Sequence, residues 1–254
     1  RLKTLLLTAA QQAAAQAGLN GNSGILADTT YGQAALNEIT GQGWWIGRPV
    51  ELPSSRPLRL EHGNIGSQLI DWPQEHVVKC LVFYHPHDAA ELRREQDELI
   101  ADVYRGCCKS GHELLLEVIL PDNNPDKDER HYLEMIEHFY RLGIQPDWWK
   151  LPPLSAENWR RVGALIDTYD PYCRGVLILG LDSPEAVLKA GFAAAADARW
   201  VKGFAVGRTI FGQPSRRWLQ GEIDDAALIE QVKQKYLTLI GFWRQYRPQA
   251  GGAH

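Results

Sequence analysis

The sequence predicts an α/β fold and, within that class, a (β/α)8 TIM barrel. Short apolar segments alternate with segments of helical periodicity, and they recur every ~20–36 residues, the length of a strand plus a crossover helix. Several apolar segments carry charged residues or glycines at or near their C-terminal ends, where a barrel assembles its active site. The glycine-rich first turn of a dinucleotide-binding fold is missing, which disfavours an open doubly wound sheet.

The chain begins with a helix, expected over residues 2–17. Leu2 and Leu6 lie on one helical face, and Gln11 and Gln12 interrupt the apolar run too early for a secretion signal. No stretch reaches the ~18 apolar residues that a membrane span requires, so we expect no membrane association.

The remaining elements follow from alternating apolar and helical patterns. Strands are expected at residues 24–28, 44–50, 77–84, 113–120, 146–151, 175–181 and 201–209. Helices are expected at residues 33–38, 89–109, 128–142, 156–169, 184–198 and 224–246. An eight-stranded barrel needs one strand more, and the chain starts in a helix without a methionine. We therefore expect the first strand of the barrel to be missing from this chain.

We expect a single TIM-barrel domain over residues 1–254. Residues 52–72 form an irregular insertion with several prolines and a short alternating stretch, and this insertion is either a lid or a surface hairpin. Residues 248–254 are rich in glycine and are predicted to be a flexible tail.

Charge and cysteine content exclude some classes of function. The net charge of −4 provides no basic field for a polyanion, so nucleic acid is not an expected partner. The 4 cysteines show neither a zinc-site spacing nor the density of a disulfide-stapled domain. Free thiols in a reducing compartment, and hence a cytoplasmic location, are the simpler interpretation.

The segment of residues 146–151 ends in a lysine, which is unusual for a core strand. Pro146 before it and two prolines after it forbid a helix, and the pair Trp148 and Trp149 favours an extended chain. Because side chains alternate along a strand, Trp148 and Lys150 share one face. This pattern makes Lys150 a candidate reactive amine.

Lys79 and Glu117 are likewise single charges within apolar strand segments. Strands of a parallel sheet are covered on both faces, so such a charge must meet a partner or line a cavity. Each alone is explained by a structural ion pair or a snorkelling side chain, but with Lys150 they interrupt three successive strands and indicate a shared site.

Two lysines and a glutamate inside a barrel suit Schiff-base chemistry. A neighbouring cation and burial both disfavour the protonated amine, and a neutral amine can attack a ketone. The carboxylate can then transfer protons. A metal-dependent reaction would need several converging ligands, and only His85, His87 and Asp88, in a turn before a helix, are candidates. We therefore expect neither a metal nor a cofactor.

A second constellation consists of glycines at the ends of the last two predicted strands. Gly180 and Gly207 would let backbone N–H groups approach a phosphate, and Arg208 would add a forked cation. The alternative is that the glycines serve helix–strand packing and that Arg208 pairs with a surface acid.

Two further residues lie at the presumed catalytic rim. Asp28 either contacts substrate or caps the following helix, and Arg48 either contacts substrate or pairs with Glu51.

Several segments of the chain resemble the aldolase domain of inositol catabolism. These are residues 78–84 with Asp88, residues 113–117, residues 147–151 and residues 203–211. The resemblance covers nearly all of the chain, and its Trp-Trp-Lys and Gly-Arg-Thr-Ile-Phe segments are specific. That domain is often fused behind a sugar kinase, and it is related to class I tagatose-bisphosphate aldolases.

The resemblance implies cleavage of 2-deoxy-5-keto-gluconate 6-phosphate, a phosphorylated keto sugar acid, to dihydroxyacetone phosphate and malonate semialdehyde. It implies that Lys150 forms the Schiff base and that Glu117 and Lys79 assist proton transfer. Phosphate binding is implied for Gly180, Gly207 and Arg208. The related aldolases carry an aspartate in an Asp-Gln-Arg or Asp-His-Arg motif on their first strand, and this motif has no counterpart here.

Two alternatives stay open at this point. The chain could be an aldolase for another ketose phosphate, such as tagatose 1,6-bisphosphate, or a non-catalytic barrel that binds a sugar phosphate. Association with a sugar kinase domain and formation of a homo-oligomer are compatible with either.

Overall fold

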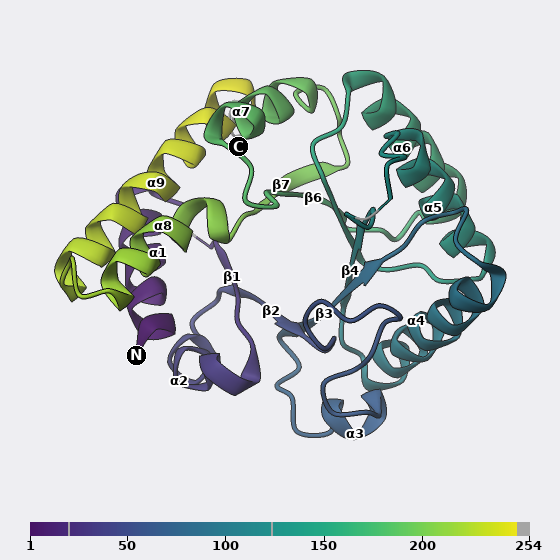
Figure 1. The fold of residues 1–254 in the computed structure, drawn as a ribbon, viewed down its shortest axis with the longest axis horizontal. Coiled ribbons are helices and arrows are strands. Elements are labelled where there is room, and N and C mark those ends of the chain that lie inside the picture. The colour runs from purple at the N-terminus through teal and green to yellow at the C-terminus, as the bar shows by residue number, and fades with distance from the viewer. Residues whose placement is uncertain (20, 123, 248–254) are drawn as a thin grey trace, which may run out of the picture.

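A computed structural model describes residues 1–19, 21–122 and 124–247 of the chain. Its strands form one 7-stranded sheet in sequence order, each strand parallel to its neighbours, curved into a ring with the helices outside (Figure 1). The strands are β1 (Gly24–Leu26), β2 (Trp45–Pro49), β3 (His76–Phe83), β4 (Leu114–Ile119), β5 (Trp148–Leu151), β6 (Gly175–Leu179) and β7 (Val201–Ala205). The predicted parallel barrel with seven strands is therefore confirmed.

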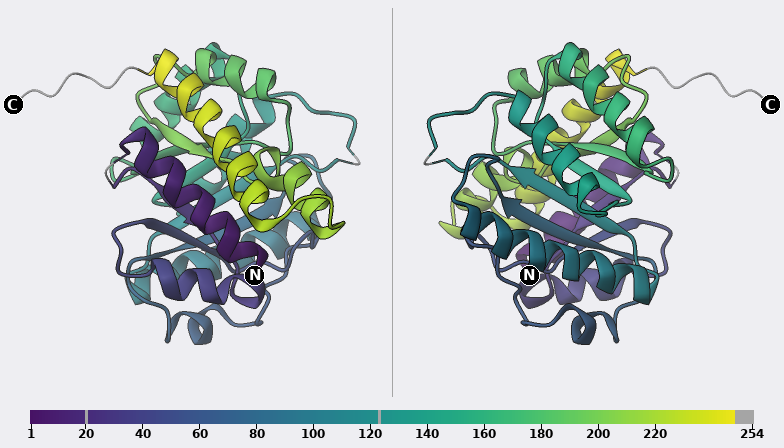
Figure 2. Two further views of the ribbon diagram at one scale, coloured as in Figure 1. Left: turned by 90° about the vertical axis from the view of Figure 1, so that its left-hand side faces the viewer. Right: turned by 90° about the vertical axis from the view of Figure 1, so that its right-hand side faces the viewer.

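The helices cover the outer face of this ring (Figure 1). They are α1 (Leu2–Ala17), α2 (Thr29–Ile39), α3 (Ile65–Leu69), α4 (Ala90–Ser110), α5 (Arg130–Arg141), α6 (Ala156–Tyr169), α7 (Glu185–Ala194), α8 (Arg208–Leu219) and α9 (Asp225–Tyr246). Figure 2 shows α1 and α9, the two ends of the chain, lying side by side on the flank opposite α4 and α5.

The ring is not closed by hydrogen bonds. In the described part of the chain, β1 pairs only with β2 and β7 only with β6, so a seam separates β1 from β7. An eighth strand would lie in this seam in a complete barrel.

Burial differs between the two faces of β3. Val78, Cys80 and Val82 point outward against the helices and are fully buried, as the core beneath a helical layer requires. Leu81 and Phe83 share the inward face with Lys79 but are only partly buried. The interior of the ring is therefore less tightly filled near the C-terminal end of β3 than the layer between strands and helices.

The last predicted strand is too long. It was expected to reach residue 209, but β7 ends at Ala205 and α8 begins at Arg208. The backbone turns at Gly207, whose φ of −112° and ψ of −89° belong to neither a strand nor a helix. The prediction was too long because the β-branched residues after Ala205 are typical of a strand. Pro214 also disfavours a helix, although it lies inside α8.

The insertion after β2 is a hairpin, one of its two predicted forms. Glu51 and Leu60 form an antiparallel bridge, and the backbone N–H of Glu61 donates to the carbonyl of Val50 at 2.9 Å. The short helix α3, which the sequence did not predict, follows it and packs on α4.

The predicted flexible tail, residues 248–254, lies outside the described residues. Within residues 1–19, 21–122 and 124–247, no helix is long and apolar enough to span a bilayer.

Candidate active site

The three predicted reactive residues meet inside the ring. Lys79 lies on β3, Glu117 on β4 and Lys150 on β5, which are neighbouring strands. Glu117 and Lys150 stand opposite each other in the register of the β4–β5 pair. Because partners in register project to the same face, their side chains extend into the interior together.

A continuous ion-pair network joins these side chains. The Nζ atom of Lys150 donates to Oε1 of Glu117 at 2.8 Å, and the Nζ atom of Lys79 lies 2.9 Å from Oε2. Lys79 also donates to Glu51, which follows β2. All four residues are at most 8% exposed, so their charges interact in a medium that screens them weakly.

Glu51 is a member of this network that the sequence analysis missed. It was weighed only as a structural partner of Arg48, and the structure corrects that pairing, since Glu51 bonds Lys79 instead. The Oε2 atom of Glu51 is buried and has no hydrogen-bond partner among the described residues. Its position in the sequence could have identified it, because residues that follow a strand of a barrel lie on the rim where the active site forms.

The two lysines differ in acidity. Burial lowers the pKa of Lys150, and the attraction of Glu117 does not fully offset that effect, with Lys79 adding repulsion. Burial also acts on Lys79, but Glu117 and Glu51 together raise its pKa above the ordinary value. Lys150 is therefore the amine that loses its proton more easily, while Lys79 stays a cation.

Glu117 is held in its ionised form. Burial would raise its pKa, but the charges of Lys79 and Lys150 and their hydrogen bonds lower it to about 2. At neutral pH the carboxylate therefore orients both amines rather than accepting a proton from either one.

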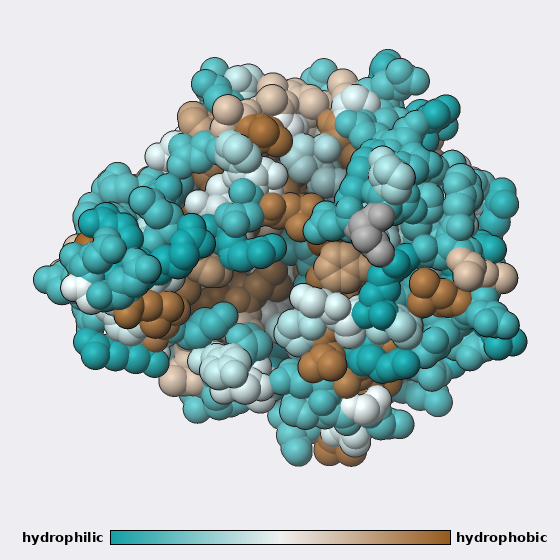
Figure 3. Space-filling model, in the orientation of Figure 1, coloured by the Kyte–Doolittle hydropathy of each residue, from teal (hydrophilic) through white to brown (hydrophobic). Residues whose placement is uncertain are grey.

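Partly buried apolar side chains lie beside the lysines on the inward face of the sheet. Leu177, the partner of Lys150 in the β5–β6 register, is only partly buried, as are Leu81 and Phe83 on the inward face of β3. The molecule seen along the ring of strands is hollowed near its centre, with apolar residues in the hollow (Figure 3).

The predicted phosphate residues come together at the start of α8. A Cβ atom on Gly180 would lie 2.8 Å from the side chain of Val206 and 3.2 Å from Thr209 Oγ1, so glycine allows the two loops to approach. Arg208 is exposed and is the first residue of α8. The backbone N–H groups of Arg208 and Thr209 donate to no protein acceptor within the described residues.

Thr209 is a second residue that sequence analysis missed. Its Oγ1 atom is buried without a hydrogen-bond partner in the part of the chain that the structure describes. Nearby, Leu181 and Asp182 follow β6 with φ of 47° and 60°, a left-handed conformation that non-glycine residues seldom adopt and that often accompanies functional loops. The backbone N–H groups of Arg208 and Thr209 belong to the N-terminus of α8 and not to the end of a strand, which corrects the predicted geometry of this constellation.

Two other predicted site residues make contacts outside the lysine network. Asp28 caps α2, where it accepts a hydrogen bond from the N–H of Tyr31 at 2.6 Å, and it pairs with Lys3 at 3.2 Å. Of its two predicted roles, the capping role is thus observed. Arg48 points to the outer face of β2, where it bonds His76 and Thr29, so the structure does not bring it to the lysines.

The histidines considered as metal ligands form a separate cluster. The rings of His85 and His131 lie 4.6 Å apart, and His131 contacts the carboxylates of Asp126 at 2.8 Å and Glu134 at 3.4 Å. Ligand atoms of His85, Asp126 and His131 lie close enough together to hold an ion. Nδ1 of His85 accepts the N–H of His87, whereas Nε2 of His85 is buried without a hydrogen-bond partner among the described residues.

The fold and the buried lysine cluster define a parallel β/α barrel with a candidate catalytic centre inside the ring. The chain belongs to a family described as an uncharacterized protein conserved in bacteria (DUF2090), whose model matches residues 1–247. No curated protein matches the chain significantly.

Solved structures with this fold include several at low sequence identity. Cgl0159 from Corynebacterium glutamicum is 16% identical, with a TM-score of 0.59 over 92% of this chain and 74% of the other. An archaeal fructose 1,6-bisphosphate aldolase is 13% identical, with a TM-score of 0.55 over 91% and 82%. An archaeal fructose-1,6-bisphosphate aldolase with its catalytic Lys covalently bound to the carbinolamine intermediate is 13% identical, with a TM-score of 0.53 over 90% and 82%.

Proposed function

We propose that this chain is a class I aldolase, a carbon–carbon lyase whose Schiff base forms on Lys150. The observation that carries the proposal is the buried network of Lys150, Glu117, Lys79 and Glu51, in which one lysine has a lowered pKa and the other stays charged. Buried ion pairs of this kind are a poor source of stability, so a chemical role is the better explanation for retaining four charges.

The first step is formation of an imine. The neutral Nζ of Lys150 attacks the ketone carbon of the substrate, and the carbonyl oxygen becomes the hydroxyl of a carbinolamine. Lys79, held as a cation, donates a proton to that hydroxyl, which leaves as water. The resulting iminium keeps a positive charge beside Glu117, so the ion pair of the resting state is preserved.

The second step breaks the carbon–carbon bond. A base removes the proton of the hydroxyl on the β carbon, and the bond between the α and β carbons breaks, so that the β carbon leaves as the aldehyde product. The electron pair of that bond forms a double bond between the α carbon and the iminium carbon, while the C=N π pair moves to nitrogen and gives an enamine. The Oε2 atom of Glu51, which has no hydrogen-bond partner in the described part of the chain, is the candidate base. Protonation of the enamine carbon and hydrolysis then release the ketone product and restore Lys150.

The proposed substrate is 2-deoxy-5-keto-gluconate 6-phosphate, cleaved to dihydroxyacetone phosphate and malonate semialdehyde in inositol catabolism. Its ketone and β-hydroxyl groups satisfy the two steps above. Its phosphate would accept hydrogen bonds from the N–H groups at the start of α8 that have no acceptor within the described residues, together with Gly180 and Arg208. The sequence resemblance to the inositol-catabolism aldolase domain supports this choice. A cytoplasmic location and association with a sugar kinase belong to the same proposal.

Product analysis tests this function. The chain is incubated with 2-deoxy-5-keto-gluconate 6-phosphate or with tagatose 1,6-bisphosphate, and dihydroxyacetone phosphate is detected by enzymatic reduction. We expect release from the first substrate and none from Lys150→Arg, whose guanidinium cannot form an imine. Release from tagatose 1,6-bisphosphate alone would favour the other aldolase. No release from either substrate, with tight binding of both, would favour the non-catalytic barrel.

A further inference from the structure

Arg48 is a buried cation that has no counterion among the described residues. It is 7% exposed on the outer face of β2, where its guanidinium lies 3.8 Å from the ring centroid of Trp72. Within the described residues no carboxylate oxygen lies within 4.0 Å of it, and its Nε is buried without a partner. An isolated buried charge is costly, so a buried arginine normally has an anion beside it.

The neutral partners of Arg48 hold it in place without cancelling its charge. Its Nη2 donates to Thr29 Oγ1 at 2.8 Å, and its Nη1 lies 3.3 Å from Nδ1 of His76. Nε2 of His76 lies 2.9 Å from Thr40 Oγ1, and that hydroxyl donates to the carbonyl of Leu36 at 2.7 Å. This chain of bonds leaves Nδ1 of His76 as an acceptor for Arg48. Burial and the charge of Arg48 lower the pKa of His76 to about 4, so the imidazole is neutral at physiological pH.

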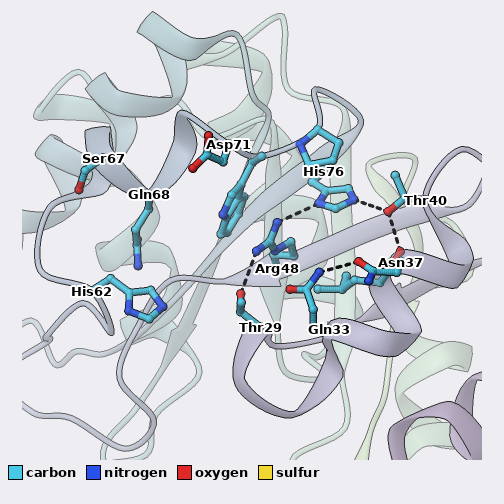
Figure 4. Close-up of a pocket in the computed structure, with 13 residues that line it drawn as sticks. Thr29, Gln33, Asn37, Thr40, Arg48, His62, Ser67, Gln68, Asp71 and His76 are labelled. Atoms are coloured by element: carbon cyan, nitrogen blue, oxygen red, sulfur yellow. Dashed lines mark hydrogen bonds between the residues drawn. The ribbon is translucent and has the colours of Figure 1, made fainter.

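A pocket of about 720 Å³ opens onto this arginine (Figure 4). It lies between α2 and the segment that contains α3, because this short helix leaves part of the outer face of β2 uncovered. Many of the side chains that line it carry amides or hydroxyls, and they include Gln33, Asn37, Gln68, Ser67 and Thr40. The one carboxylate in its lining, Asp71, is exposed to solvent, which screens its charge.

We propose that this pocket binds a small oxyanion, the phosphate or carboxylate group of a polar metabolite, through Arg48. A guanidinium presents parallel N–H donors that match either group, and the surrounding amides and hydroxyls suit the rest of a hydroxylated molecule. The pocket lies on the outer face of β2, while the lysine network lies inside the ring. The inference therefore does not depend on the proposed aldolase activity.

The test compares anion binding with and without each arginine. Inorganic phosphate and acetate are titrated separately by calorimetry into the Arg208→Ala protein, so that binding at the start of α8 does not obscure the result. We expect at least one anion to bind, and Arg48→Gln in that background to weaken it roughly tenfold or more. Arg160 is an exposed arginine on α6, and Arg160→Ala in the same background is the matched control that should leave anion binding unchanged. Phosphate binding alone would indicate a phosphorylated ligand, and acetate binding alone a carboxylate.

Crystals of the unmodified chain soaked in phosphate or acetate provide a second measurement that does not depend on folding of the variants. We expect density within hydrogen-bond distance of the Arg48 guanidinium. The proposal is overturned if Arg48 stays bare while the anion occupies other sites, or if folded Arg48→Gln protein binds both anions as tightly as its parent.

Discussion

Glu117 is the residue on which the buried network depends, since it contacts both lysines. Glu117→Gln keeps the side-chain shape but leaves two amines with less compensation in a buried site. We expect the free energy of unfolding to fall by about 3–5 kcal/mol in urea titrations. Glu38→Gln, at an exposed position on α2, should change it by less than about 0.5 kcal/mol. Equal effects of the two substitutions would show that the network is not energetically coupled.

The pKa of Glu117 predicts how stability varies with pH. Its folded pKa of about 2 lies below the ordinary value of 4.5, so its contribution is present above pH 4.5 and is lost as the pH falls toward 2. We expect the urea midpoint of the wild-type chain to fall more steeply over this interval than that of Glu117→Gln. Parallel pH profiles for the two proteins would mean that this carboxylate is not held ionised by the lysines.

At the scale of elements, the contact between the loop after β6 and the start of α8 depends on glycine. A Cβ on Gly180 would lie 2.8 Å from Val206, whereas one on Gly203 would lie 3.5 Å from Leu177, an ordinary contact. We therefore expect Gly180→Ala to destabilise the fold by about 1–3 kcal/mol and Gly203→Ala to have a clearly smaller effect. Thermal unfolding of the pair measures this difference, and the reverse order would show that the two loops do not approach as described.

The first turn of α8 should discriminate phosphorylated from dephosphorylated substrate. Arg208→Ala removes a charge-assisted contact, so we expect transition-state stabilisation for the phosphorylated substrate to fall by about 2–3 kcal/mol, measured as kcat/KM. Turnover of the dephosphorylated analogue should change little, as should both reactions in Arg160→Ala. Equal slowing of both substrates by Arg208→Ala would assign the arginine a structural role.

For the whole molecule, the seam between β1 and β7 predicts uneven stability. The central strands β3, β4 and β5 are paired on both sides, whereas β1 and β7 each have one paired neighbour in the described part of the chain. We expect amides of the central strands to be protected longest in hydrogen exchange measured by mass spectrometry, and those of β1 and β7 to exchange sooner. Equal protection of all strands would indicate that another segment or molecule covers the seam.

The sequence predicted the parts of this molecule that local pattern determines. Lys79, Glu117 and Lys150 stand out because strands covered on both faces are otherwise apolar, and strand order placed them on neighbouring strands. The pattern did not reveal Glu51 as the partner of Lys79, because ion pairing between strands depends on how far each strand is staggered against the next. The expected pairing of Arg48 with Glu51 was wrong because the two residues are separated by an odd number of positions, so alternation along the extended chain turns their side chains to opposite faces.

The helix α8 shows a different limit of the sequence. Its Gly212 and Pro214 are poor helix formers, and the preceding β-branched residues continue the pattern of β7. Packing of α8 against α9 outweighs these preferences, and no local pattern reports that contact.

The central claim is that Lys150 is the amine that forms a Schiff base. Sodium borohydride added to the chain in the presence of dihydroxyacetone phosphate reduces an imine to a stable secondary amine, and peptide mass spectrometry locates it. We expect a single adduct on Lys150, no adduct in Lys150→Arg, and no adduct on Lys79, because Glu117 and Glu51 keep that lysine protonated. An adduct on Lys79, or no adduct on a folded chain saturated with dihydroxyacetone phosphate, would contradict this account.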